Sequence, residues 1–221
     1  MNTELKKRII TSIGLLSLLT TMYFYSFIMI GVLLIMAIII WIEFYALISK
    51  IIRGNKFQDI FFRFIFKSTS LLYLSTFVGF IFVIESHYID LKIYLLYSVL
   101  VAILSDIGGL VFGKTFKGKK LTKISPNKTI SGSIGSIVLS MVLIPIFYNE
   151  LIIYDLFTLI ILTIVISLIS QIGDLFISFL KRKAKVKDTS DLLPGHGGLL
   201  DRVDGIIFAA PFGVLLLNFL D

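Results

Sequence analysis

Apolar stretches of nearly membrane-spanning length recur along almost the whole chain. A helix needs roughly 20 apolar residues to cross about 30 Å of hydrocarbon. About seven stretches approach this length, namely 9–24, 27–48, 68–84, 92–113, 131–148, 152–180 and 205–220. Only 16% of the 221 residues are charged, against about a quarter in soluble domains. The sequence therefore predicts an all-α integral membrane protein, a polytopic helix bundle of about seven transmembrane helices, with residues 1–221 as a single membrane domain.

Basic residues gather on one side of this predicted bundle. Alternate threading places the N-terminus and the loops 49–67, 114–130 and 181–204 on one side, and Lys92 is the only exception among 21 lysines and arginines. Such an excess marks the cytoplasmic side, so we expect a multi-pass protein of the cell membrane with cytoplasmic polar loops. The net charge of +7 then reflects topology and contacts with anionic lipid or nucleotide, and no nucleic acid is expected as a partner. The aromatic segment 57–67 favours an interfacial helix.

The chain contains no cysteine, which excludes disulfides, thiolate nucleophiles and Cys-ligated metals. Of its two histidines, His87 falls in a loop on the opposite side from His196. A zinc site is therefore disfavoured, because it would lack a second nitrogen ligand. Carboxylates combined with substrate phosphates are instead the typical setting for Mg²⁺.

The first polar block covers about residues 105–135. Asp106 interrupts an apolar helix, where a lone carboxylate costs a few kcal/mol and needs a partner, a cation or a water-filled cavity. Gly109 and Gly113, spaced four apart, are equally typical of a close helix-packing face. Further along, Lys128 precedes Thr129, a good N-cap whose helix has free N–H groups that attract phosphate. Plain helix initiation remains the alternative interpretation of that cap.

The second polar block covers about residues 173–205. Asp174 and Ser178, at i and i+4, share a helix face. From Ser178 to Asp204 the chain carries seven cations or histidines beside four carboxylates. The Pro-Gly-His-Gly-Gly turn in this stretch leaves backbone N–H groups free to meet an anion. We interpret the block as a polyphosphate and metal site at a membrane surface, although a solvated charged face would explain Lys183 and Lys185 equally well.

One stretch of this block has an identifiable pattern. The residues S-F-L-K-R, K-D, S and L-P-G-H-G-G-L-L-D-R-V-D between Ser178 and Asp204 resemble the signature of the phosphatidate cytidylyltransferases, the CDP-diacylglycerol synthases. S-D-x-G-G from Ser105, with Gly113-Lys114, and S-P-x-K-T from Ser125 resemble a second block of that family. The N-terminal LKKRIITSIG and WIEFYAL are similar to its first hairpin.

The resemblance implies transfer of CMP from CTP to phosphatidic acid, which gives CDP-diacylglycerol and pyrophosphate in phospholipid biosynthesis. It implies one or two Mg²⁺ ions held by Asp174, Asp201 and Asp204. The implied catalytic residues are Asp174, Ser178, Lys187, Asp188, His196, Asp201, Arg202 and Asp204. The implied substrate-binding residues are Asp106, Lys114, Ser125, Lys128, Thr129, Lys181, Arg182, Gly195, Gly197 and Gly198. CTP, phosphatidic acid and membrane lipids are the expected partners, and a homodimer is left open.

The chain departs from the family pattern at two positions. Where members commonly carry glutamate, it has Ser131 and Ile177, and it is shorter than usual between residues 49 and 92. A non-catalytic homologue is therefore one alternative. A CTP-dependent transferase or kinase acting on another lipid or on a polyprenol is a second. A cation transporter is a third, motivated by carboxylates within membrane helices, but the concentration of charge at one surface disfavours it.

Overall fold

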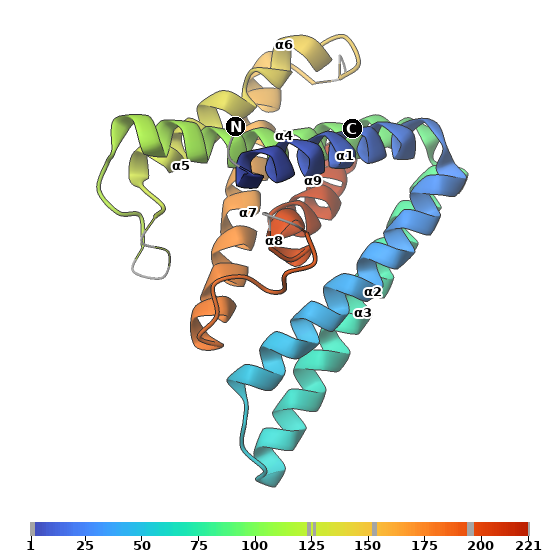
Figure 1. Cartoon of the computed structure of the whole chain (residues 1–221). Helices are drawn as coiled ribbons and strands as arrows, with labels where there is room; N and C mark the ends of the chain where they lie inside the picture. Colours follow the sequence, from blue (N-terminus) through green and yellow to red (C-terminus); the bar gives the residue numbers. More distant parts are fainter. Residues whose placement is uncertain (1–2, 123–124, 126, 152–153, 194–196, 221) are drawn as a thin grey trace. The chain divides into compact units, whose positions relative to one another are not determined.

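The computed structural model describes residues 3–122, 125, 127–151, 154–193 and 197–220, and the regular structure in these ranges is helical apart from two isolated bridges (Figure 1). The helices are α1 (Thr3–Phe24), α2 (Ser26–Ile51), α3 (Phe57–His87), a 3₁₀ turn η1 (Ile89–Leu91), α4 (Lys92–Phe116), α5 (Ile130–Ser140), α6 (Leu143–Phe147), α7 (Leu156–Lys183), α8 (Leu200–Val203) and α9 (Ile206–Leu220). The predicted all-α class is confirmed.

Six helical segments are long and apolar enough to cross a membrane within the described ranges. They are Ser26–Ile51, Phe57–His87, Ile89–Phe116, Ile130–Phe147, Leu156–Lys183 and Leu200–Leu220. Each contains most of one predicted apolar stretch, so the polytopic bundle is confirmed. The remaining stretch, 9–24, forms its helix within α1 but is not among the six. Its apolar part begins only after Arg8 and falls short of the roughly 20 residues that a full crossing needs.

Residues 57–67 are helical as predicted, and they form the first turns of α3, which continues without a break to His87. Their interfacial position stays a prediction. The two cations of this segment are accommodated against α2 and the turn after it. The Arg63 guanidinium donates to the carbonyl of Ile52 at 3.5 Å, and the Lys67 ammonium lies 3.2 Å from the ring centroid of Tyr45. Because each cation has a partner, Arg63 and Lys67 can belong to the same helix as the apolar residues that follow.

The chain forms two compact units. The first consists of residues 1–86 and 180–203, and the second of residues 87–179 and 204–221. The chain passes from one unit to the other at the end of α3, again within α7 and again directly after α8. The single-domain organisation stays a prediction.

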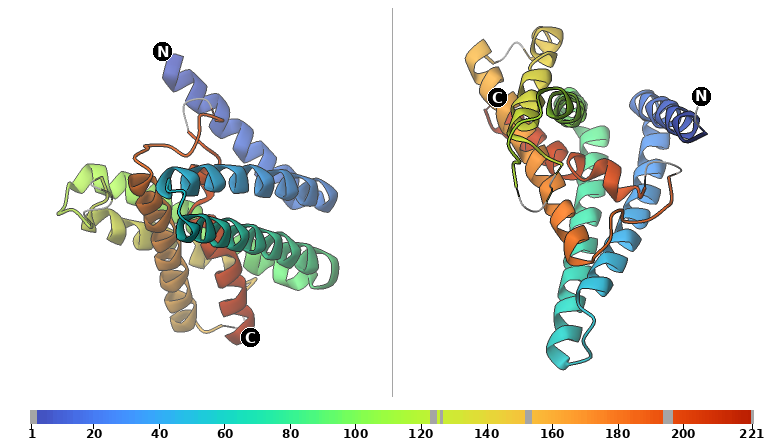
Figure 2. Two further views of the ribbon diagram at one scale, coloured as in Figure 1. Left: turned by 90° about the horizontal axis from the view of Figure 1, so that it is seen from below. Right: turned by 60° about the vertical axis from the view of Figure 1, so that its left-hand side comes forward.

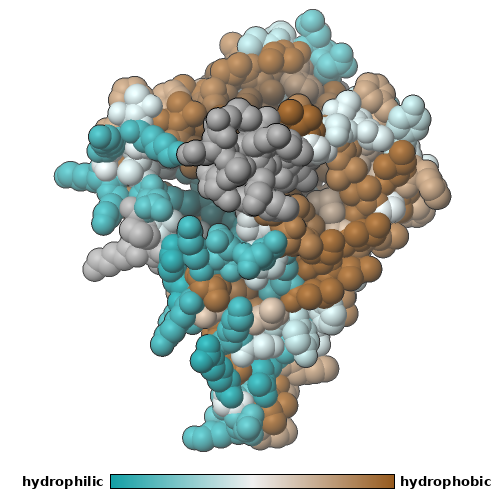
Figure 3. All heavy atoms as spheres, viewed as in Figure 1, coloured by the Kyte–Doolittle hydropathy of each residue, from teal (hydrophilic) through white to brown (hydrophobic). Residues whose placement is uncertain are grey.

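In the first unit, α2 and α3 lie side by side as an antiparallel hairpin (Figures 1 and 2). The indole N–H of Trp41 donates to the carbonyl of Lys67 at 3.1 Å, and Ser26 hydrogen-bonds to Glu85 near the other end. Only 17% of the apolar window of either helix is buried, and Phe27 is 90% exposed. Figure 3 shows hydrophilic side chains at the turn of the hairpin and apolar ones along its flank. Such exposed apolar faces suit contact with lipid.

In the second unit, α4 packs against α5 through glycines. A Cβ atom on Gly108 would lie 2.4 Å from the carbonyl oxygen of Gly135, and one on Gly135 would lie 2.3 Å from Cβ of Phe112. Gly109 and Gly113 belong to the same seam, since their Cβ atoms would lie 2.9 Å and 3.2 Å from hydroxyls of the α5 region. Small residues let membrane helices approach closely. The helix-packing interpretation of Gly109 and Gly113 is therefore confirmed.

Buried hydroxyls join α4 to α5 and α7 in this unit. The hydroxyl of Ser136 donates to the carbonyl of Ser105 at 2.6 Å, and the hydroxyls of Ser105 and Ser167 lie 3.0 Å apart. Tyr97 and Thr163, both fully buried, share a hydrogen bond of 2.5 Å. Interhelical hydrogen bonds of this kind complement close packing where no water is available.

The glycine seam predicts that Gly108→Ala lowers stability, because the new methyl group would collide with backbone, which cannot rotate away. We expect a loss of about 1–3 kcal/mol, typical of overpacking, measured as a lower melting temperature of the purified protein in detergent. Gly79→Ala is the matched control, since a Cβ atom there meets nothing within 4 Å. It should be neutral or slightly stabilising. Equal melting temperatures for both variants would contradict a tight α4–α5 contact.

Candidate functional site

The predicted site residues fall in both units. In the first unit, Asp201 lies at the start of α8, and only 4% of its side chain is exposed. Both of its carboxylate oxygens accept hydrogen bonds. Its Oδ1 accepts from the ammonium of Lys181 at 2.7 Å. Its Oδ2 accepts from the backbone N–H groups of Thr189 at 2.8 Å and Gly198 at 3.0 Å. The ammonium neutralises the carboxylate, and hydrogen bonds to a charged group contribute about 1.5–3 kcal/mol each.

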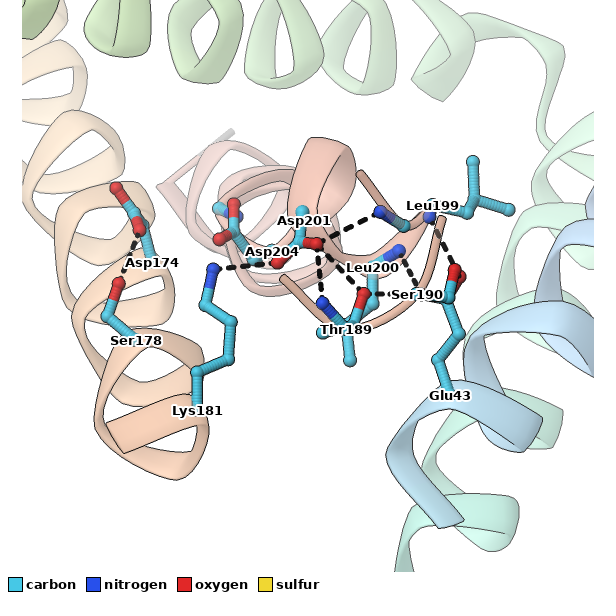
Figure 4. Close-up of polar contacts among 12 residues, drawn as sticks. Glu43, Asp174, Ser178, Lys181, Thr189, Ser190, Leu199, Leu200, Asp201 and Asp204 are labelled. Carbon is cyan, nitrogen blue, oxygen red and sulfur yellow. Dashed lines mark hydrogen bonds and ion pairs between the residues drawn. The ribbon is translucent and has the colours of Figure 1, made fainter. Parts of the chain in front are cut away.

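A second carboxylate in this unit received no role from the sequence. Glu43 on α2 is 4% exposed and accepts four hydrogen bonds from the segment 189–200 (Figure 4). The donors are the hydroxyls of Thr189 and Ser190 and the backbone N–H groups of Leu199 and Leu200. Glu43 could have been found by the argument applied to Asp106, because it is a lone carboxylate inside a long apolar stretch.

Glycines shape the turn that precedes α8. Gly197 has φ +81°, a left-handed conformation that favours glycine, and it exchanges two backbone hydrogen bonds with Leu193 at 2.8 Å and 3.1 Å. A Cβ atom on Gly198 would lie 1.9 Å from the Thr189 hydroxyl oxygen. The predicted residues Gly195 and His196 lie outside the described residues.

The expectation of free N–H groups in the Pro-Gly-His-Gly-Gly turn is wrong for its described glycines, Gly197 and Gly198. The N–H of Gly197 donates to Leu193, that of Gly198 to Asp201, and those of Leu199 and Leu200 to Glu43. Asp201 therefore occupies one amide of the turn at which a substrate anion was expected, and Glu43 occupies the two amides that follow it. The reason is that a buried carboxylate is stable only where donors surround it, and these backbone amides are donors within its reach.

In the second unit, Asp174 on α7 forms an ion pair with Lys128 and accepts a hydrogen bond of 3.3 Å from the hydroxyl of Ser178 (Figure 4). The predicted pairing of Asp174 with Ser178 is confirmed. The ion pair also joins the two polar blocks, which lie far apart in sequence. Lys128 stands directly before Thr129, whose side chain accepts from the N–H of Gly132 at 3.0 Å and caps α5 as predicted.

Asp204 belongs to the same unit. Its side chain is buried and accepts from the N–H of Gly205 at 2.9 Å. A Cβ atom on Gly173 would lie 2.8 Å from the backbone oxygen of Asp204, so α7 passes in direct contact with the chain at this point. One turn earlier on α7, the fully buried hydroxyl of Ser170 has no hydrogen-bond partner among the described residues. The helix turn that carries Asp174 thus adjoins Asp204 and an unsatisfied oxygen.

The remaining predicted residues lie nearer to solvent or lipid. Asp106 is half-buried on α4, the side chain of Lys114 is exposed in the last turn of that helix, and the carbonyl of Ser125 accepts from the N–H of Lys128 at 3.1 Å. Arg182, Lys187, Asp188 and Arg202 are exposed. At the two positions that depart from the family pattern, the hydroxyl of Ser131 accepts from the N–H of Gly118 at 3.2 Å, and Ile177 is buried.

The donors present are oxygens, which suit a hard cation such as Mg²⁺. Asp174, Asp204 and Ser170 offer them in the second unit, and Asp201 offers them in the first. No group of three or more Asp, Glu or His side chains that could hold a metal occurs among the residues that the structure describes. The ammonium groups of Lys128 and Lys181 neutralise Asp174 and Asp201.

Comparison with known sequences identifies the family. A sequence profile of the Cytidylyltransferase family matches residues 1–220. The chain belongs to this family. Among relatives of this family member, the phosphatidate cytidylyltransferase of Staphylococcus saprophyticus is 35% identical over 182 residues, which cover 81% of this chain and 68% of the relative. That of Staphylococcus aureus is 37% identical over the same shares, and that of Staphylococcus haemolyticus is 42% identical over 56% of this chain and 48% of the relative. The predicted resemblance is confirmed.

The turn before α8 yields a second prediction. Gly198→Ala should open the segment 189–200, because its methyl group would overlap the Thr189 hydroxyl and approach Glu43 Oε2 to 2.7 Å. Limited proteolysis with trypsin should then cut faster after Lys187 and after Arg202, the two sites that flank the segment. Leu192→Ala is the control, since it removes a side chain that is 52% exposed in the same loop. Unchanged cleavage of Gly198→Ala would show that the turn has room for a side chain.

Proposed function

We propose that this family member is a phosphatidate cytidylyltransferase, which transfers CMP from CTP to phosphatidic acid and releases pyrophosphate. The observation that carries the proposal is the family match over residues 1–220. Relatives named for this reaction match 81% of the chain. The carboxylates and cations of the signature, described above, are consistent in type with a reaction between two anions.

In the proposed reaction, a phosphate oxygen of phosphatidate attacks the α-phosphorus of CTP. A new P–O bond forms, and the bond from the α-phosphorus to the bridging oxygen breaks, so that pyrophosphate leaves with the electron pair. No nucleophile from the protein is required. The protein must instead bring two anions together, and cations that neutralise them lower the barrier. We assign this role to Lys128, Lys181, Arg182, Lys187 and Arg202.

Asp174, Asp201 and Asp204 are the proposed holders of one or two Mg²⁺ ions. Bound Mg²⁺ would neutralise charge on the triphosphate and on the leaving pyrophosphate. Lys128 and Lys181 already neutralise two of these carboxylates. We propose that these ammonium groups turn to phosphate oxygens when substrate is present, which keeps each carboxylate compensated in both states.

The remaining predicted residues keep supporting roles in this proposal. Ser178 and Asp188 orient groups beside the carboxylates, and His196 with Gly195, Gly197 and Gly198 lets the backbone approach the triphosphate. The polar residues of the other block are assigned to substrate binding, namely Asp106, Lys114, Ser125 and Thr129. The acyl chains of the lipid can stay in the bilayer while its headgroup reaches the cytoplasmic side, which explains why the catalyst is a membrane protein.

The activity is testable directly. Purified protein in detergent, given radiolabelled CTP, Mg²⁺ and phosphatidate, should form labelled CDP-diacylglycerol, and chelation of the metal should stop it. Asp174→Asn and Asp201→Asn should each lower turnover by more than about 100-fold, since they remove a proposed metal ligand. Asp90→Asn, at an exposed carboxylate outside the site, should retain activity.

The same assay separates the alternatives. Near-normal rates in either aspartate variant would refute the metal role. Phosphorylation of a polyprenol by CTP, without product from phosphatidate, would replace the proposed acceptor. A wild-type protein that is inactive with every acceptor, while Ser131→Glu gains activity, would identify a non-catalytic homologue.

The cytoplasmic orientation of the polar loops gives a further prediction, and the absence of native cysteine makes it simple to test. Cysteines introduced at the exposed residues Asn55 and Asn127 should be protected from a membrane-impermeant maleimide in intact cells. Cysteines at Tyr88 and Asn149, which are also exposed, should be labelled. The opposite pattern would invert the topology.

A further inference from the structure

We propose that Glu43 is a positioning residue, whose buried carboxylate fixes the segment 189–200 and, through it, Asp201. The catalytic consequence of this inference rests on the proposed function, because Asp201 is a proposed metal ligand. The positioning itself does not depend on the proposed function, and every residue involved lies in the first unit.

Both carboxylate oxygens of Glu43 are fully used. Oε1 accepts from the hydroxyl of Ser190 at 2.6 Å and from the N–H of Leu199 at 3.0 Å. Oε2 accepts from the hydroxyl of Thr189 at 2.9 Å and from the N–H of Leu200 at 2.8 Å. Each oxygen thus binds one side chain from the beginning of the segment and one backbone amide from its end. A single side chain of α2 thereby ties the two ends of the segment together.

Thr189 connects Glu43 to Asp201. Its hydroxyl oxygen lies 2.9 Å from Glu43 Oε2 and 3.0 Å from Asp201 Oδ2, and its backbone N–H donates to the same Asp201 oxygen at 2.8 Å. A hydroxyl has one proton and can donate to only one carboxylate at a time. The two acids therefore share this hydroxyl, and the position of Asp201 depends on the residue that Glu43 holds.

Helix packing alone does not explain a carboxylate at this position. A charge inside an apolar helix is costly, and an apolar side chain of similar volume would pack α2 as well or better. What only a carboxylate provides is acceptance from four donors in fixed directions. Two of them are adjacent backbone amides, which cannot rotate, so the carboxylate sets the orientation of the first residues of α8.

Conservative variants separate charge, length and acceptor capacity. Glu43→Gln keeps the volume, but its NH₂ group must face the N–H of Leu199 or of Leu200 in either orientation of the amide. Glu43→Asp keeps the charge, but it is one methylene too short to reach the same four donors. Ser190→Ala removes one hydroxyl donor and leaves both amides paired.

The experiment combines hydrogen–deuterium exchange with steady-state kinetics on the full-length protein in detergent. Amides in 189–200 should exchange at least about tenfold faster in Glu43→Gln and Glu43→Asp, and less so in Ser190→Ala, while peptides from α4 and α5 stay unchanged. Turnover of CTP with phosphatidate should fall by about 10–100-fold in both Glu43 variants, as for residues that orient metal ligands. Asp90→Asn is again the control.

A double-mutant test distinguishes positioning of Asp201 from a merely structural role of Glu43. If Glu43 acts on Asp201 through Thr189, then Glu43→Gln combined with Thr189→Val should lower turnover no further than the worse single variant. Effects that multiply would overturn the proposed route. Unchanged exchange in 189–200 for Glu43→Gln, or faster exchange in every helix, would overturn the positioning role. Normal turnover in a Glu43 variant whose 189–200 amides exchange faster would also overturn the positioning role. Absence of activity in the wild type would refute the proposed function, and the exchange result would still decide the positioning.

Discussion

Hydrocarbon offers no hydrogen-bond partner to a polar group, and this constraint governs how the described part of the chain is organised. The backbone satisfies itself in helices, six of which are long enough to cross a bilayer. Hydroxyls within the second unit bond to neighbouring helices, as Ser136 does to the carbonyl of Ser105. The buried carboxylates of Glu43 and Asp201 draw most of their donors from Thr189, Ser190 and residues 198–200, and this demand fixes those residues.

The carboxylates of Asp174, Asp201 and Glu43 are compensated in two different ways. Asp174 and Asp201 are each paired with a lysine, Lys128 in one unit and Lys181 in the other, so that neither negative charge is left uncompensated. Glu43 instead accepts from two hydroxyls and two backbone amides, which suit a fixed structural acceptor. This difference agrees with the proposed chemistry. In it, Asp174 and Asp201 exchange a lysine ammonium for Mg²⁺, and Glu43 keeps the same donors.

The glycines of the two polar blocks serve different needs. Gly108 and Gly135 bring α4 and α5 within backbone contact, which is a matter of packing. Gly197 adopts a left-handed conformation and Gly198 leaves no room for a side chain, which is a matter of forming the turn. The spacing of Gly109 and Gly113 predicted close packing, and the Pro-Gly-His-Gly-Gly run predicted a turn, but neither pattern identified the atoms that each glycine meets.

Local pattern determined most of the helices and several contacts. Apolar length predicted the membrane segments, i to i+4 spacing predicted the pairing of Asp174 with Ser178, and cap chemistry predicted Thr129, because each depends on neighbours in the chain. The signature between Ser178 and Asp204 also determined the family. Only the tertiary structure decided that Glu43 and Asp201 occupy the amides of residues 198–200, and that Lys128 meets Asp174. Residue 43 lies more than a hundred positions from its donors, and no spacing rule encodes a meeting that the packing of helices brings about.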